Sequence, residues 1–272
     1  MATQNYKNYF DELDSIILLF EALQNECSAK GYPIESVSAI EQVISKVLMK
    51  IYKSIIALRL LCKEGFTEDS QPIVRNVLES TIICSWLALD NDPIKLRQLQ
   101  KKEDISAHER VVKYKLLLEE KQKLNPNEVT KRELENALEW LSRYKADSEV
   151  PNCPELYEMA RIIDSSKKLY SNKMRMLHTI MYWLPTLYVH FSFESLGNFH
   201  WEEENLTSFV AAPNFDSVPE IILHICRISI LFSEIFNKTF KLGLEQRIED
   251  ENVKLKHLAK NYIENNIKSE SM

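Results

Sequence analysis

The sequence predicts an all-α fold, in which residues 1–272 form a single multi-helix bundle with an inserted charged helical hairpin. Three observations support this fold class. Apolar residues recur at helical spacing along most of the chain. Glycine, which strand turns and phosphate-binding loops need, occurs only 4 times. Apolar residues make up 45% and charged residues 27%, as in ordinary globular proteins. We therefore expect helices joined by short loops, and neither a Rossmann nor a P-loop site.

The N-terminal third of the chain predicts three helices. Apolar periodicity over 5–29 predicts the first helix, and a longer apolar stripe over 34–64 predicts the second. The third begins after Asp69 or Ser70, either of which can cap a helix, with Pro72 in its first turn. This third helix is apolar on nearly every side, so we expect it to lie at the centre of the bundle.

Residues 94–147 differ in composition and predict the charged helical hairpin. Their apolar residues are sparse and stand among many charges. A solvated helix pair braced by i,i+4 ion pairs, projecting from the core, is the ordinary interpretation. The alternatives are an arm for homo-oligomerisation, a contact for a partner protein, or a cover over a site.

The rest of the chain predicts further helices separated by one long loop. Helices are expected over 155–164 and 167–192, and residues 194–216 read as an irregular loop. A strongly apolar helix is expected over 217–240. Residues 241–272 are charged and predict a C-terminal helix or tail that frays at its end.

Charge, cysteine usage and hydropathy restrict the classes of partner. A net charge of -6 argues against nonspecific nucleic-acid binding through bulk charge, although a local basic groove is compatible with it. The five cysteines are scattered and form no C-x-x-C pair, which predicts a reducing cytoplasm without disulfides. The N-terminus is not a signal peptide, and no uncharged apolar stretch reaches membrane-spanning length. We therefore expect a cytoplasmic protein without a membrane partner.

Arg75 and Glu79 stand one turn apart on the otherwise apolar third helix. Charges on a buried helix must be paired or take part in chemistry. The two side chains can pair with each other, and each then has hydrogen-bonding capacity left over. Two interpretations remain open. The pair is an internal brace, or Arg75 binds an anionic group while Glu79 holds it in position.

The helix over 167–192 supplies a candidate partner for this pair. One side of it is polar without being highly charged, and carries Arg175, Thr179, Tyr182, Thr186 and His190. Such a stripe fits a semi-buried polar cavity, an interface, or a surface face distorted by Pro185. His190 is expected near the helix end, where it can act as a general acid or base or simply cap the helix.

Metal and cofactor motifs are missing from the sequence. It contains no H-E-x-x-H motif, no E-x-x-H pair and no G-x-S-x-G motif. His190 and Glu194 have i,i+4 spacing, but two ligands are weak grounds for a metal site. The acidic run that begins at His200 is expected to be a solvated loop. We predict no cofactor and no metal.

The block over 54–89, with Arg75 and Glu79 in an R-x-x-x-E arrangement, resembles the core of domain of unknown function 5677, a family of bacterial and archaeal proteins. The family's second signature is a Tyr-rich helix that ends in Tyr-Val-His. Matching residues here are Tyr182, Tyr188, Val189, His190 and Ser192, while Phe191 stands where the family often has proline. The resemblance covers about 45–240, with the charged hairpin as its variable part, and implies a compact helical domain without an established reaction.

More loosely, the chain is similar to HEPN-type helical toxins and defence ribonucleases. Those proteins carry Arg and His four to six residues apart on one helix, and that spacing is missing here, since Arg175 is too close to His178 and too far from His190. Arg75 and His190 would therefore have to meet across helices. The resemblance implies a stress- or phage-defence effector acting on a phosphate-bearing or nucleic-acid ligand, with Arg75, Glu79, Tyr182 and His190 as candidate catalytic residues. The alternative is a noncatalytic interaction module in which this cluster is structural.

Overall fold

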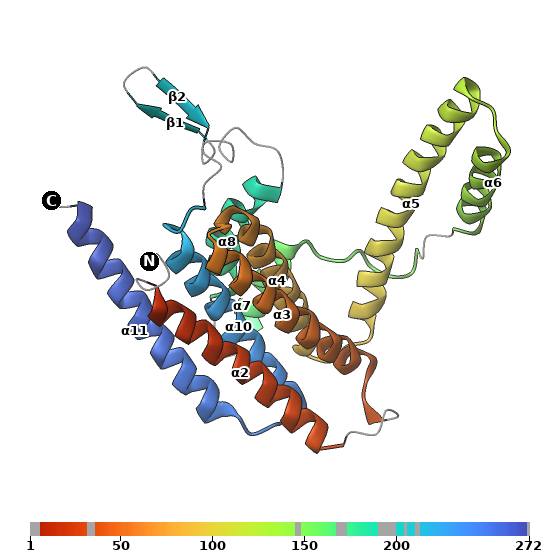
Figure 1. The fold of residues 1–272 in the computed structure, drawn as a ribbon. Coiled ribbons are helices and arrows are strands. Elements are labelled where there is room, and N and C mark those ends of the chain that lie inside the picture. Colours follow the sequence, from red (N-terminus) through yellow and green to blue (C-terminus); the bar gives the residue numbers. More distant parts are fainter. Residues whose placement is uncertain are drawn as a thin grey trace. The chain divides into compact units, whose positions relative to one another are not determined.

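The structure is a computed structural model that describes residues 6–31, 36–144, 148–166, 173–189, 200–203, 206–209 and 213–270. The chain divides into two compact units, one formed by Met1–Asp90 with Leu156–Met272 and the other by Asn91–Glu155. The first unit is a multi-helix bundle and the second is a helical hairpin (Figure 1). The predicted all-α class is confirmed. That the whole chain acts as a single domain stays a prediction.

The first unit is built from helices that surround a central pair. Its helices are α2 (Lys7–Ala29), α3 (Ala39–Glu64), α4 (Thr67–Ala88), α7 (Leu156–Ser166), α8 (Met174–Val189), α10 (Val218–Phe240) and α11 (Glu245–Glu270). The central helix α4 packs against α3, α7, α8 and α10, and α10 also packs against α2 and α11. Stacked rings of Phe20 and Phe232 join α2 to α10, with centroids 6.0 Å apart. The prediction that the third helix is central is therefore confirmed.

The turn between α3 and α4 explains two differences from the predicted boundaries. Helix α3 begins at Ala39 rather than at 34, because Ser38 caps it and forms a reciprocal capping box with Glu41. Helix α4 begins at Thr67 rather than after Asp69, so Pro72 lies beyond its first turn. Acidic residues in the first turn favour this earlier start through the helix dipole.

Gly65 ends α3 in a left-handed conformation, with φ of 79°. A Cβ atom at this position would lie 2.5 Å from Cβ of Pro213 and 2.9 Å from Cζ of Phe215. The close approach allows the amide of Asn214 to donate to the Gly65 carbonyl at 2.9 Å. Only glycine combines this backbone angle with this contact at low energy. The start of α4 is thereby fixed against the segment that leads into α10.

A two-stranded hairpin lies inside the segment that was predicted to be an irregular loop. Strands β1 (His200–Glu203) and β2 (Leu206–Phe209) pair antiparallel, with Trp201 opposite Ser208 and Glu202 opposite Thr207. The loop prediction is wrong for these residues. Aromatic and β-branched residues favour strands, and they are interspersed here among the acidic residues that suggested a loop.

The second unit consists of α5 (Ile94–Leu124) and α6 (Glu128–Arg143), packed against each other. The Asn127 side chain caps α6 by accepting from the amide of Thr130 at 2.8 Å. The expected i,i+4 ion pairs are present, for example between Lys115 and Glu119 at 3.2 Å. The helical hairpin is thus observed within 94–147, and its projection from the core stays a prediction.

Candidate functional site

Arg75 and Glu79 form an ion pair on α4, as their spacing predicts. Arg75 Nε donates to Glu79 Oε1 at 2.9 Å, and the side chains are 18% and 35% exposed. Burial by itself lowers the pKa of Arg75, but the hydrogen bond to Glu79 and the contact with Tyr182 outweigh it and raise that pKa. The guanidinium is therefore charged at every physiological pH.

Tyr182, on α8, holds the other edge of the same guanidinium. Arg75 Nη2 donates to the Tyr182 hydroxyl at 2.8 Å, and Arg75 Cζ lies 4.5 Å from the centroid of the Tyr182 ring. The third nitrogen, Nη1, is buried and has no hydrogen-bond partner among the residues that the structure describes. A buried charged donor without an acceptor costs about 1–3 kcal/mol or more. Two contacts therefore fix the plane of the guanidinium while one of its donors lacks an acceptor.

His178 extends this cluster along α8. Its ring stacks on Tyr182, with centroids 4.6 Å apart and planes 15° apart, and it meets the ring of Tyr157 from α7 edge-on at 5.6 Å. Burial lowers the pKa of His178, and the negative charge of Glu79 opposes that change. A lowered pKa keeps this imidazole mostly neutral at pH 7, so that one ring nitrogen can accept a proton.

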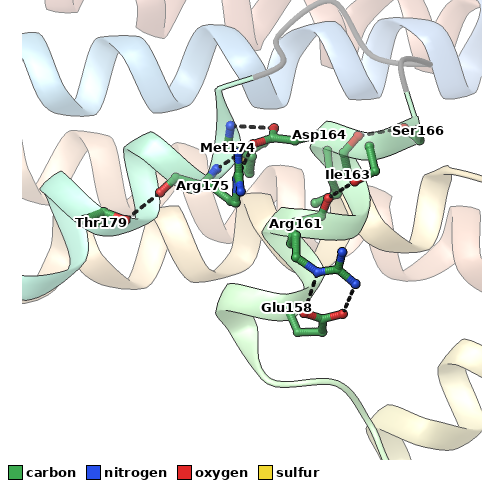
Figure 2. A network of polar contacts seen from close by, with 9 residues as sticks. Glu158, Arg161, Ile163, Asp164, Ser166, Met174, Arg175 and Thr179 are labelled. Carbon is green, nitrogen blue, oxygen red and sulfur yellow. Dashed lines mark hydrogen bonds and ion pairs between the residues drawn. The ribbon is translucent and has the colours of Figure 1, made fainter.

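Asp164 positions α8, and with it His178 and Tyr182. The Asp164 side chain comes from α7 and is 11% exposed. It accepts from the amide of Met174 at 2.8 Å and from the amide of Arg175 at 3.1 Å, as Figure 2 shows. These amides begin α8 and have no acceptor within the helix, so the carboxylate caps α8 from a neighbouring element. An exposed ion pair between Glu158 and Arg161 lies one turn earlier on α7 (Figure 2).

The structure brings together three of the four predicted site residues. Arg75, Glu79 and Tyr182 are in contact, whereas His190 lies outside the described residues, as do the ends of the helix predicted over 167–192. The predicted polar stripe on that helix is divided in the structure. Arg175 and Thr179 are exposed, whereas Tyr182 contacts Arg75 of α4.

Sequence reasoning missed His178 because Arg175, on the same helix, stands only three residues before it, closer than the spacing in the helical toxins. The i,i+4 spacing of His178 and Tyr182 was the available signal, since residues at that spacing share a helix face. No group of three or more His, Cys, Asp and Glu side chains is placed to hold a metal ion among the residues that the structure describes. Of the described helices, none combines the length and the apolar character that a membrane span requires.

The fold and the cluster define an all-α protein with a polar centre assembled between α4, α7 and α8. The chain belongs to the DUF5677 family, a family of unknown function whose model matches residues 41–207. This match includes Arg75, Glu79 and the described part of α8, and it ends before α10, earlier than the resemblance to about 240 indicated. Searches of the curated proteins and of the solved structures each return no match.

Proposed function

We propose that the cluster around Arg75 binds a phosphate-bearing ligand. The observation that carries this proposal is the buried Nη1 atom of Arg75, which has no acceptor among the described residues. An anionic oxygen is the acceptor that satisfies a guanidinium best, because the hydrogen bond is then charge-assisted. Glu79 and Tyr182 act as positioning residues, since they occupy Nε and Nη2 and leave Nη1 for the ligand.

His178 adds a candidate general base to the proposed phosphate-binding site. It contacts Tyr182, and its lowered pKa favours the neutral form at pH 7. A neutral imidazole near a phosphate-binding arginine is the arrangement that general base chemistry on a phosphate ester requires. Within the proposal, His178 takes the part that the sequence assigned to His190.

We further propose that the protein acts in the cytoplasm as an effector of stress or phage defence, with a nucleic acid as the phosphate-bearing ligand. Free cysteines support the compartment, because Cys62, Cys84 and Cys226 are buried as thiols. Burial raises the pKa of Cys62 to about 11 and that of Cys84 to about 12, which keeps these thiols protonated and unreactive. The resemblance to helical defence toxins supports the role by analogy only.

Replacement of Arg75 tests the binding proposal. Titration calorimetry with inorganic pyrophosphate and with a short single-stranded RNA is expected to show binding to the wild-type protein. Arg75→Gln should weaken it at least about tenfold, since a charge-assisted hydrogen bond contributes about 1.5–3 kcal/mol. The matched control is Arg59→Gln, because Arg59 makes two hydrogen bonds to Asp14 at 2.5 and 2.9 Å. Equal binding by wild type and Arg75→Gln would refute the proposal.

Inducible expression in a bacterial host tests the defence role separately. Wild type should slow growth and degrade cellular RNA, and Arg75→Ala should do neither while its melting temperature stays close to that of wild type. A large loss of folding in Arg75→Ala would instead identify the ion pair as a structural brace.

A noncatalytic interaction module is the second candidate function, and we propose a second copy of this chain as its partner. One observation favours it: the second unit leaves large apolar side chains in solvent on both of its helices. They include Leu116 (54% exposed), Leu117 (60%), Leu138 (45%) and Trp140 (40%). Two antiparallel hairpins can bury such residues against each other as a four-helix bundle, which is a self-complementary arrangement.

A further inference from the structure

A second polar site lies where α2, α10 and α11 meet, outside the residues that the family model matches. Glu12, on α2, is only 7% exposed, and its Oε1 atom is buried without a hydrogen-bond partner among the described residues. Glu251, on α11, is equally buried at 6% exposure but well satisfied. It accepts from the Ser15 hydroxyl at 2.8 Å and from Lys254 Nζ at 3.0 and 3.2 Å. Of these two carboxyl groups, Glu12 is the one that lacks a donor.

Glu12 lines an open depression of about 500 Å³ on the seam between α2 and α11. The other residues of the lining are Asn8, Val253, Lys254, His257, Leu258 and Asn261. Glu12 is the buried member of this set, and the others are exposed or half-buried. The carboxyl group of Glu12 therefore lies at the floor of the depression, where a ligand that enters it can approach this group.

The residues that line the depression fit a ligand that combines a cationic hydrogen-bond donor with an apolar part. Lys254 is engaged by Glu251, so the ionised form of Glu12 leaves one negative charge uncompensated. Side-chain oxygens of Asn8 and Asn261 can accept further hydrogen bonds, and Val253 and Leu258 offer an apolar wall. We propose that this depression binds a small alkylammonium compound, whose ammonium group donates to Glu12 and whose alkyl chain lies on Val253 and Leu258.

The protonation of Glu12 is coupled to this binding. Burial and, to a smaller extent, the charge of Glu251 raise the pKa of Glu12 to about 7, against the opposing charge of Lys254. From α10, Cys226 faces the same two carboxyl groups as a protonated thiol, since burial raises its pKa well above the ordinary value. An ammonium group stabilises the ionised form of Glu12. Below pH 7 the ligand therefore has to displace a proton from Glu12.

Titration calorimetry of the full chain with n-butylammonium chloride tests the proposal. Binding is expected at about pH 8, and its affinity should fall about tenfold per pH unit below pH 7, with a proton released on binding. Glu12→Gln keeps the size of the side chain and should reduce affinity at least about tenfold. The matched charge control is Asp11→Asn, because Asp11 is exposed on the same helix and should leave affinity within about twofold.

A comparison of ligands on the wild-type protein keeps the test independent of how the variants fold. n-Butyltrimethylammonium has the same charge and alkyl chain but no N–H donor, so it should bind at least about tenfold more weakly. The proposal is overturned if both ammonium compounds bind equally, or if Glu12→Gln binds n-butylammonium as tightly as wild type. It is also overturned if the wild-type protein binds no n-butylammonium.

Discussion

Glu234 shows how the surroundings of a single carboxyl group on α10 set its charge. It lines a cavity of about 750 Å³ together with Arg227, Glu249 and Lys256. Burial raises the pKa of Glu234 to about 7, and the charge of Glu249 acts in the same direction against Arg227 and Lys256. Arg227 is already engaged, since it donates to Asn252 Oδ1 at 2.8 Å. Glu234 is therefore partly protonated at neutral pH.

The raised pKa of Glu234 predicts a pH dependence of stability. The ordinary carboxyl pKa applies in the unfolded chain, so between about pH 4.5 and 7 the folded state holds a proton that the unfolded state has released. The free energy of unfolding should fall as the pH rises through this window. In Glu234→Gln, the free energy of unfolding should fall by about 1 kcal/mol less over this window than in wild type. This figure allows for solvent screening of a half-buried group. Urea unfolding at several pH values measures this. Glu264→Gln, on an exposed part of α11, should leave the slope unchanged.

At the scale of the element, α8 depends on a cap from a different helix. The amides of Met174 and Arg175, at the start of α8, bond to the side chain of Asp164 on α7. This contact fixes both the starting point and the rotation of α8. The rotation decides that Met174, Leu177 and Met181 are buried while Tyr182 contacts Arg75.

Asp164→Ala should therefore destabilise α8 and loosen the cluster around Arg75. Loss of a helix cap costs about 0.5–2 kcal/mol, so the free energy of unfolding should fall by about that amount. Hydrogen exchange should rise first at the amides of α8, because they lose their acceptor. Glu158→Ala, which removes an exposed ion pair one turn away, should leave both measurements nearly unchanged. Faster exchange spread evenly over all helices would contradict a local capping role.

Comparison of α4 and α8 indicates what the sequence can and cannot predict. Apolar residues on nearly every side of α4 indicate that the helix is buried, so its central position could be predicted from its residues alone. The same pattern predicted that Arg75 needs a partner. The i,i+4 spacing of His178 and Tyr182 predicts their contact along α8, whereas the contact of Tyr182 with Arg75 depends on the rotation of α8. That rotation is set by Asp164, ten residues before Met174 in the chain. Periodicity carries no information about such a cap from another helix.

The burial of Glu12, like the rotation of α8, depends on contacts between helices that the local sequence does not indicate. The sequence does not single out Glu12 on α2, because its burial requires α11 to cover it. Helix α11 is charged, and its sequence predicted a helix or tail that frays at its end, but not that its face toward α2 and α10 buries Ile248, Glu251 and Leu255. The way a polar helix packs against distant parts of the chain depends on the whole bundle. The sequence around Glu12 therefore does not indicate that its side chain is buried.

At the scale of the whole molecule, the apolar side chains of the two units are distributed differently. The first unit contains nearly all of the buried large apolar residues, and its core centres on α4 and α10. Within the second unit, Leu118, Ala137 and Val150 are buried, whereas most of its larger apolar side chains are exposed or half-buried. A hairpin of this kind gains stability when a second hairpin covers it, because two helices alone bury little apolar area.

Self-association through the second unit is therefore the expected state at high protein concentration. Sedimentation velocity should show a concentration-dependent shift from monomer to dimer for the wild-type chain. Leu117→Asp should raise the dimer dissociation constant at least about tenfold, because it places a charge in an apolar contact. Leu60→Asp is the matched control, because Leu60 is 56% exposed on α3 of the first unit and should leave the equilibrium unchanged. If Leu60→Asp dissociates the dimer and Leu117→Asp does not, the contact belongs to the helical bundle and the hairpin has another role.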